Sequence, residues 1–194
     1  GLRELLTNQA LKDEVLQVIE VCFENLRLLE KKSPFNFVSP LRVHAHYTID
    51  QILAAFGYYN EKQKPAFREG VKYFEEERTD VFFVTLNKSD KDFSPSTLYD
   101  DYAINEQLFH WQSQSRTSDT SPTARRLFNH RKTNNKISIF VREYRNEGAY
   151  TSPFIFLGTA DYVKHEGSKP VSIIWKLHEP MPAYLVSSAN KNVL

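Results

Sequence analysis

The sequence predicts an α+β fold, in which N-terminal helices precede a β-rich, barrel-like or strongly bent sheet of mainly antiparallel strands. Three observations support this fold class. Apolar residues recur every three or four positions near the N-terminus, which is typical of helices. Short runs of aromatic and β-branched residues, bounded by Gly, Pro, Asn or Ser, follow in the rest of the chain. The fourteen Phe, ten Tyr and two Trp, against only six Gly, indicate a folded chain and exclude collagen and wholesale disorder.

Two helices are predicted before the strands begin. Between Asn8 and Leu29 the apolar residues lie on one stripe, which predicts an amphipathic helix with that stripe buried. Cys22 falls on the stripe and is expected to act as a small buried hydrophobe. A second helix is expected from Thr48, a suitable N-cap, to a stop at Gly57.

Seven strands and one short helix are predicted to follow. The strands are expected at residues 70–74, 80–86, 108–112, 137–144, 154–157, 160–163 and 171–177. Ser121-Pro122 is typical of a helix start, so residues 123–128 are predicted to be helical. The tail after Pro180 and Pro182 is expected to be irregular. We expect residues 1–42 to form a helical junction and residues 43–194 to form a β-rich recognition domain.

The sequence excludes several classes of function. No stretch approaches the roughly 18 to 20 apolar residues of a membrane helix, and the N-terminus does not resemble a secretory signal. A cytoplasmic protein without a membrane partner is therefore expected. The six glycines form neither a phosphate loop nor a dinucleotide fingerprint, and a single cysteine supplies no disulfide or thiolate zinc site. No cofactor is expected.

A metal-dependent nuclease is the weaker alternative. His44 and His46 would point to one face of an extended segment, with His110 and His130 as possible partners. However, no Asp/Glu-x-Lys motif follows Asp80, as one common nuclease arrangement requires. We therefore assign no catalytic residue and no metal ligand.

The net charge of +1 is the sum of two opposed segments. Residues 74–106 contain nine acidic and three basic residues, a net charge of −6. Residues 116–145 contain eight basic and two acidic residues, a net charge of +6. Six of these eight cations are arginines, whose planar guanidinium groups suit phosphate or carboxylate. Two interpretations remain open: a basic surface that binds a partner, or internal pairing between the segments.

The residues around the start of the basic segment are suited to nucleic acid. Trp111 could stack on a base, Gln112 and Gln114 could read base edges, and neighbouring hydroxyls suit phosphate. Alternatively, Trp111 is a core residue at the end of a strand. The candidate binding residues are Trp111, Gln112, Ser113, Gln114, Arg116, Arg125, Arg126, His130, Arg131, Lys132 and Lys136.

Several longer motifs resemble a known family. They include residues 80–89 (DVFFVTLNKS), 108–115 (LFHWQSQS), 140–144 (FVREY) and 162–170 (YVKHEGSKP). They closely resemble the domain-of-unknown-function family 3427, over about Val43 to Ala183. Members of this family usually form the C-terminal part of bacterial superfamily II helicases of the DEAD/DEAH type. Many of these helicases also carry a phospholipase-D-like nuclease domain.

The resemblance implies a module of a larger DNA-processing, restriction or phage-defence protein, whose parent is an ATP-dependent helicase. It assigns no catalytic residue, because the family's activity is unassigned. By analogy, a small β-rich domain in this setting is similar to PUA- and SRA-type barrels, which pocket an extruded, modified base. We expect a non-catalytic DNA-recognition module whose partners are double-stranded DNA, either plain or modified, and the parent helicase and nuclease domains. The alternative is a docking or regulatory domain that binds the helicase without contacting DNA.

Overall fold

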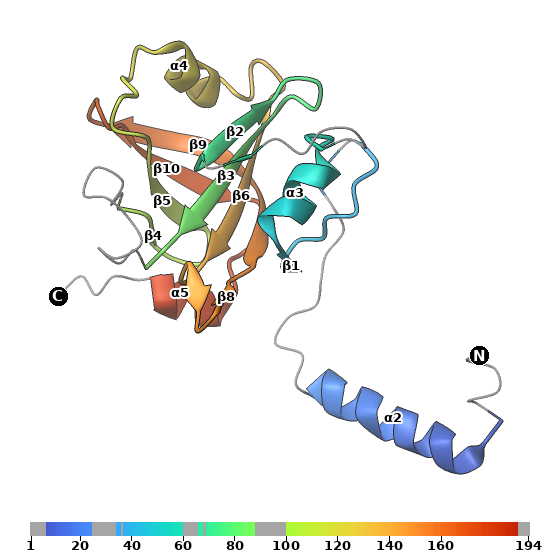
Figure 1. The fold of residues 1–194 in the computed structure, drawn as a ribbon. Helices are drawn as coiled ribbons and strands as arrows, with labels where there is room; N and C mark the ends of the chain where they lie inside the picture. The colour runs from blue at the N-terminus through green and yellow to red at the C-terminus, as the bar shows by residue number, and fades with distance from the viewer. Residues whose placement is uncertain are drawn as a thin grey trace.

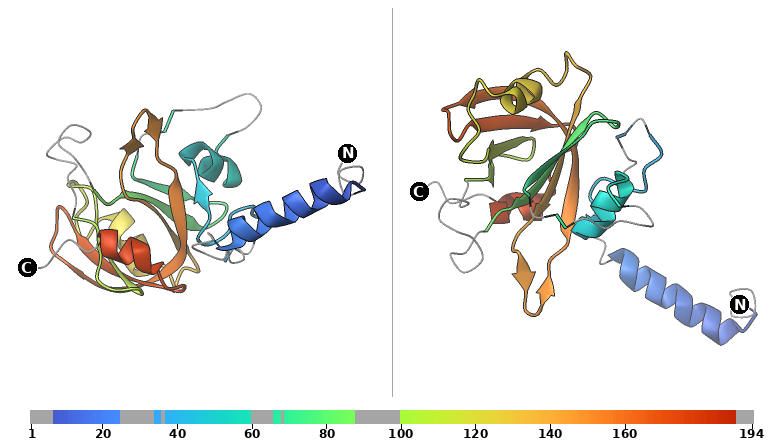
Figure 2. Two further views of the ribbon diagram at one scale, coloured as in Figure 1. Left: turned by 90° about the horizontal axis from the view of Figure 1, so that it is seen from below. Right: turned by 45° about the horizontal axis from the view of Figure 1, so that its top comes forward.

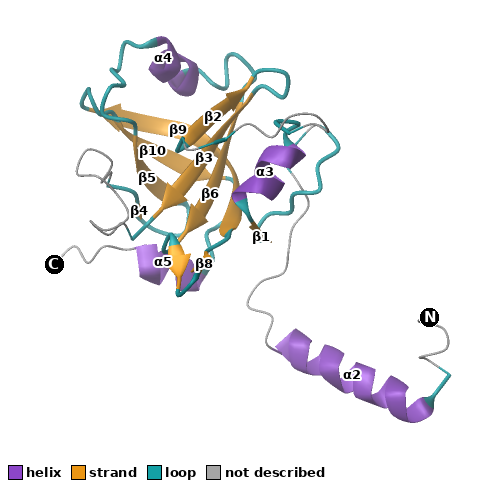
Figure 3. Ribbon diagram, viewed as in Figure 1, coloured by secondary structure: helices purple, strands orange, loops and turns teal. Residues whose placement is uncertain are grey.

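A large curled sheet with short helices at its two ends forms most of the molecule (Figures 1 and 3). The computed structural model describes residues 7–24, 34–35, 37–59, 66–67, 69–87 and 100–189. The helices are α2 (Gln9–Glu24), α3 (Ile49–Ala55), α4 (Pro122–Phe128) and α5 (Ala183–Ala189). The strands are β1 (His46–Tyr47), β2 (Val71–Phe74), β3 (Thr79–Thr85), β4 (Tyr102–Ala103), β5 (Leu108–Gln112), β6 (Lys136–Arg142), β7 (Asn146–Glu147), β8 (Tyr150–Thr151), β9 (Phe154–Glu166) and β10 (Ser172–Leu177).

The sheet is open and mainly antiparallel. Its strand order is β2-β3-β6-β9-β10-β5-β4, with β1 paired to β9 outside this path. Only the pairing of β3 with β6 is parallel among the described strands, and β7 and β8 form a separate hairpin. The described strands at the two edges, β2 and β4, do not pair with each other, so the expected barrel is not closed. One physical reason is the shortness of β4, which pairs with β5 through Tyr102 and Ala103 alone.

Both faces of the sheet are buried. Along β3, Phe82 and Val84 belong to the cluster inside the curl, whereas Val81 and Phe83 belong to a second cluster outside it. This alternation follows from the two-residue period of a strand. Figure 2 shows the curl of the sheet in two further views.

The short helix α3 covers the outer cluster. Thr48 is the N-cap, as predicted, and forms a capping box with Gln51: the Gln51 amide donates to Thr48 Oγ1 at 3.3 Å, and the Thr48 amide donates to Gln51 Oε1 at 2.8 Å. Ile52 and Leu53 are fully buried beneath the helix. The cap confirms the predicted start of the helix at Thr48.

One long strand replaces two predicted ones. β9 runs without interruption through Gly158, where a break had been expected. Gly158 has φ +92°, and the register between β6 and β9 shifts beside it, between Ile139 and Phe140. The glycine therefore marks a bend within a continuous strand rather than the end of one.

The N-terminal helix α2 is present, but the prediction of a buried stripe is wrong for the described residues. Leu11, Leu16, Val18 and Ile19 are all more than one third exposed, and α2 lies apart from the sheet in Figure 1. The Cys22 side chain lies outside the described part of the chain. None of the described helices is both long and apolar enough to cross a membrane.

The tail is helical rather than irregular. After Pro182, whose carbonyl accepts hydrogen bonds from the Leu185 and Val186 amides, the chain forms α5. Met181 and Leu185 are each 2% exposed and pack in the inner cluster. The burial of these apolar side chains thus stabilises α5. The two prolines, Pro180 and Pro182, had led to the prediction of an irregular tail.

Candidate nucleic-acid interface

Helix α4 lies at one end of the curled sheet, opposite α5 and the β7–β8 hairpin (Figure 1). The helix begins as the sequence predicts: Ser121 Oγ accepts the Ala124 amide at 3.2 Å, and Pro122 occupies the first helical position. Ala124 and Leu127 are buried, whereas Arg125 is exposed. The helix therefore presents Arg125 outward while its other face packs on the sheet.

Arg126 holds α4 to the strands β2 and β3. Its Nη2 donates to Asp80 Oδ1 at 2.7 Å and its Nε donates to Asp80 Oδ2 at 3.0 Å. Its guanidinium also lies 4.0 Å from the ring centroid of Tyr73. Burial raises the pKa of Asp80, which is fully buried, and the contact with Arg126 opposes that increase. Arg126, a predicted phosphate contact, is thus engaged within the protein.

An aromatic group holds the other side of α4 to β9. The Phe128 ring is stacked on His165 with 3.8 Å between centroids and an interplanar angle of 5°. The hydroxyl of Tyr162 and Nδ1 of His165 are 2.6 Å apart, within hydrogen-bond distance. Helix α4 is therefore fixed on both sides, to β3 through Arg126 and to β9 through Phe128.

His130 is also engaged within the fold. Its side chain is 3% exposed, Nε2 accepts the Tyr162 amide at 3.0 Å, and Nδ1 lies 3.2 Å from the Asn135 carbonyl. These contacts require a neutral ring that carries its proton on Nδ1. Burial lowers the pKa of His130 below its ordinary value. A buried, neutral histidine does not supply a charge for phosphate.

Asp161 on β9 contacts Arg131 and His178, and Thr159 contacts His178 in turn. Arg131 Nη2 and His178 Nε2 lie 3.0 Å and 3.2 Å from its Oδ2, and Thr159 Oγ1 lies 2.8 Å from His178 Nδ1. Burial raises the pKa of Asp161, but the contacts with His178 and Arg131 together lower it by more than burial raises it. The pKa of Asp161 is therefore lower than its ordinary value. The Arg131 side chain remains 62% exposed and can therefore still reach an external phosphate.

The predicted base-reading residues on and after β5 are largely engaged in the fold. Trp111 is 6% exposed and stacks on Phe82, the core arrangement that the sequence left open as an alternative. The Gln112 side chain accepts the Asp100 amide at 3.2 Å, and Ser113 Oγ accepts the Val171 amide at 2.9 Å. Gln114 is half-buried, and its carbonyl closes the following turn.

Lys136 is likewise directed inward. Its Nζ donates to the Pro34 carbonyl, and burial lowers the pKa of the amine. Among the predicted cations, Arg126 and Lys136 therefore serve internal contacts. The exposed ones are Arg116, Arg125, Arg131 and Lys132.

Lys169 joins these exposed cations, although sequence reasoning did not select it. It lies at the tip between β9 and β10, and its amide donates to the Thr117 carbonyl at 3.1 Å. Ser168 Oγ donates to Asp119 Oδ1 at 3.0 Å, which ties the same tip to the loop before α4. The two segments are about fifty residues apart in sequence, so no local pattern could have indicated their proximity.

We call the exposed residues Arg116, Arg125, Arg131, Lys132 and Lys169 the basic surface. Among the described residues, no carboxylate lies within ion-pair distance of Arg116, Arg125, Lys132 or Lys169. Among the described residues, the ion pair of Arg126 with Asp80 links the acidic and basic segments. The β2–β3 turn, with Glu75, Glu76 and Glu77, lies at the same end of the sheet (Figure 1), and its Arg78 carbonyl accepts the Lys136 amide at the start of β6 at 2.8 Å.

The histidines do not form a metal centre within the described residues. No group of three His, Cys, Asp or Glu side chains there is placed to hold a metal ion. His44 is buried with a backbone φ of 71°, and its amide donates to the Phe156 carbonyl, whereas His46 is exposed. The chemistry available at the α4 end is therefore charge and hydrogen bonding.

Comparison with known proteins places the chain in a family without an assigned activity. A family model described as a domain of unknown function, DUF3427, matches residues 41–188. The matched range includes every strand of the large sheet and α4, and it excludes α2. No match was found among curated proteins.

Proposed function

The chain belongs to the DUF3427 family of domains of unknown function, and we propose that it is a non-catalytic recognition module that holds duplex DNA on the basic surface. The observation that carries this proposal is the division of the cations around α4. Arg126 is used to fix the helix to Asp80, whereas Arg125 and Lys132 extend outward without a carboxylate partner in the described residues.

Unpaired cations in a fixed position favour a polyanion. Internal pairing would explain the exposed cations only if they met the acidic segment, and Arg116, Arg125 and Lys132 meet no carboxylate among the described residues. Guanidinium and ammonium groups bind phosphates, and the release of condensed counterions supplies much of the affinity for DNA. Because α4 is held on both sides, Arg125 would be presented without the ordering cost of a flexible loop.

The acidic turn at Glu75, Glu76 and Glu77 limits where DNA could lie. Carboxylates repel phosphates, so the duplex would approach from the side of Arg116 and Lys169, at the loop before α4 and the β9–β10 tip. We also propose that the chain is part of a larger helicase and nuclease protein that acts in DNA processing, restriction or phage defence. In the most specific form of the proposal, the chain recognises a modified base in the duplex.

Fluorescence anisotropy with a labelled duplex tests the proposal. With about four phosphates contacted, affinity should fall on the order of a hundredfold between 50 and 200 mM salt. The double variant Arg125→Glu/Lys132→Glu should lose binding. The matched control Lys12→Glu/Lys176→Glu makes the same change in net charge at exposed residues of α2 and β10 and should bind like the wild type. Salt-independent binding, or equal losses in both double variants, would contradict the proposal.

A panel of duplexes tests the more specific form. Plain, methylated, hydroxymethylated and phosphorothioate duplexes of one sequence are compared at both salt concentrations. A preference that persists at high salt indicates contacts to the modification, since phosphate contacts weaken with salt. Equal affinities across the panel would leave a backbone-binding module and would reject modification reading.

The exposed apolar residues of α2 favour a second candidate function. Leu16, Val18 and Ile19 are about half exposed on a helix outside the family match, and such a face usually meets another protein. In this alternative the chain docks on a helicase and does not contact DNA. A chain that shifts no duplex or single strand, yet binds the helicase core until Val18 and Ile19 are changed to Ser, would favour docking.

A further inference from the structure

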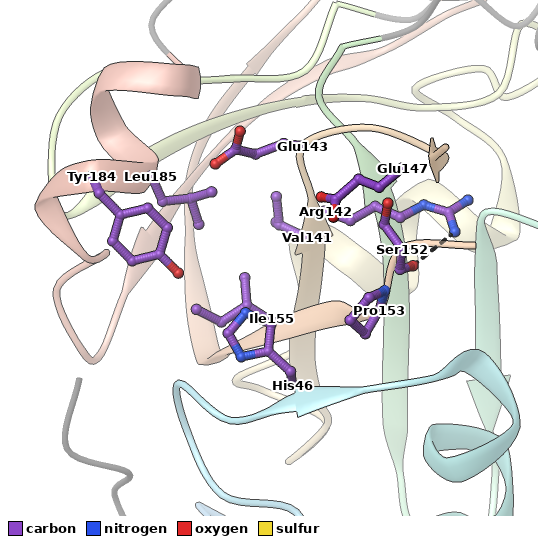
Figure 4. Close-up of a pocket in the computed structure, with 10 residues that line it drawn as sticks. All are labelled: His46, Val141, Arg142, Glu143, Glu147, Ser152, Pro153, Ile155, Tyr184 and Leu185. Atoms are coloured by element: carbon purple, nitrogen blue, oxygen red, sulfur yellow. Dashed lines mark hydrogen bonds between the residues drawn. The ribbon is translucent and has the colours of Figure 1, made fainter. Parts of the chain in front are cut away.

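A second possible site lies at the other end of the sheet from the basic surface (Figures 1 and 4). It is a pocket of about 200 Å³ between β6, the β7–β8 hairpin and α5. Val141, Ile155 and Leu185 supply apolar lining, and Glu143, Glu147 and Ser152 supply polar lining. The proposed DNA contacts use none of these residues.

The hydroxyl of Ser152, which lines this pocket, lacks a hydrogen-bond partner. Ser152 is 6% exposed. Its backbone is satisfied, because the amide donates to the Arg145 carbonyl at 3.0 Å and the carbonyl accepts Arg142 Nη1 at 3.3 Å. Buried hydroxyls are rarely left without a partner, so this one indicates a ligand group that the pocket can admit.

The charge of the lining indicates the kind of ligand. Glu143 and Glu147 form no ion pair within the described residues. Arg142, which also lines the pocket, forms no ion pair with either glutamate: its Nε donates to Thr85 Oγ1 at 3.0 Å, and its guanidinium lies 4.4 Å from the Phe154 ring centroid. The pocket therefore contains two carboxylates without an ion-pair partner among the described residues.

We propose that this pocket binds an alkylammonium or alkylguanidinium group. The methylene groups of such a ligand would lie on Val141, Ile155 and Leu185. Its charged nitrogen would meet Glu143 and Glu147 and would donate to Ser152 Oγ. An anion would be repelled by the carboxylates, and the described residues hold no group of three metal ligands. The inference does not depend on DNA binding.

The size of the pocket agrees with a small group. Sites for drug-sized ligands usually enclose about 300–1,000 Å³, and this pocket is smaller. Figure 4 shows Tyr184 and His46 around the same opening as Glu147 and Ser152, so the Tyr184 ring would lie near a bound cation. Two sources share this chemistry: a free polyamine, and a lysine or arginine side chain of another protein.

NMR titration of the whole chain tests the site. The free ligands are agmatine and cadaverine, and the side-chain ligands are blocked tripeptides with Lys or Arg between two glycines. We expect chemical-shift changes at His46 and Tyr184 with the free amines, with the tripeptides or with both. The set of ligands that binds more tightly identifies whether the natural ligand is a free polyamine or a protein side chain. No shift at millimolar concentration of any of the four would overturn the proposal. So would equal binding of pentanol, which lacks the charge.

Variants separate ligand binding from folding. Glu143→Gln/Glu147→Gln should weaken the amine at least tenfold, whereas the exposed control Glu106→Gln should leave the affinity unchanged. Ser152→Ala should weaken binding severalfold without lowering the melting temperature of the free chain, because it removes a hydroxyl that has no partner. Unchanged affinity in the double variant would overturn the proposal, as would a fall in melting temperature without loss of binding in Ser152→Ala.

Discussion

The indole of Trp111 on β5 lies against the ring of Phe82 on β3, with 4.3 Å between centroids and an interplanar angle of 21°. In the strand order, β6, β9 and β10 stand between these two strands. In a flat sheet the strands would be roughly 19 Å apart. The contact is therefore a direct consequence of the curl: the inner faces of distant strands meet across the interior. Two parts of the same sheet therefore pack face to face, although the sheet does not close into a barrel.

This contact predicts a large and shared loss of stability. Phe82→Ala or Trp111→Ala should each lower the free energy of unfolding by about 3–5 kcal/mol, because each leaves a cavity in the core. The double variant should cost less than the sum of the two, since the rings contact each other. Urea unfolding monitored by circular dichroism measures all three. Additive losses would show that the rings do not pack together in solution.

The position of Trp111 was only half predictable. Residues 108–112 were predicted to be a strand, and Trp111 to be either a base-stacking residue or a core residue at its end; Trp111 and Phe109, two positions apart, share one face and are both buried. Which strand that face meets depends on the strand order, and residue patterns do not encode a pairing between β10 and β5. The ring that could have stacked on a base therefore stacks on Phe82. Trp111→Phe should preserve DNA affinity if the basic surface is the binding site.

Neighbouring arginines on α4 should respond in opposite ways. Arg126→Met should lower the free energy of unfolding by about 3 kcal/mol, because it leaves the fully buried Asp80 without its partner. Arg125→Met should change stability by less than about 0.5 kcal/mol, because the side chain is exposed, but it should weaken DNA binding. Thermal unfolding and anisotropy on the same preparations measure both effects. Equal stability of the two variants would contradict the role given to Arg126.

Sequence alone could not separate these two arginines. Helical spacing places Arg125 and Arg126 about 100° apart, which predicts that they face different directions but not which one faces the sheet. Asp80 is the deciding residue, and it is 46 positions away. The N-cap Ser121 and Pro122 were local signals and were sufficient to predict the helix itself. Local chemistry thus predicted the element, and tertiary contacts determined which of its cations are available.

Gly158 should be intolerant of a side chain because of its backbone conformation. Its φ of +92° is unfavourable for L-residues, whereas the added Cβ would lie at an ordinary 3.4 Å from Val43 Cγ2. Gly158→Ala should therefore cost about 1–3 kcal/mol. Gly57→Asn is the control: φ is +68°, nothing lies within 4 Å, and Asn tolerates this conformation after a helix. If Val43→Ala restored the stability of Gly158→Ala, steric contact rather than φ would be the cause.

The buried His130 should make the protein less stable in mild acid. Burial lowers its pKa from the ordinary value of 6.5, so below that pH the unfolded chain takes up a proton that the folded site resists. The contribution of His130 to the free energy of unfolding is therefore fully present above about pH 6.5. It decreases as the pH falls, by at most about 1.4 kcal/mol per pH unit. The direction is the same whether the loss is measured by urea or by heat.

Substitution of His130 isolates its contribution to this dependence. His130→Gln should lower stability at pH 7, because the ring's contacts with Tyr162 and Asn135 are lost, and it should also flatten the decline between pH 7 and pH 5. His46→Gln, at an exposed histidine, should retain the wild-type slope. Urea unfolding at several pH values gives both slopes. A decline that is equally steep in His130→Gln and in the wild type would show that His130 is not the group that resists protonation.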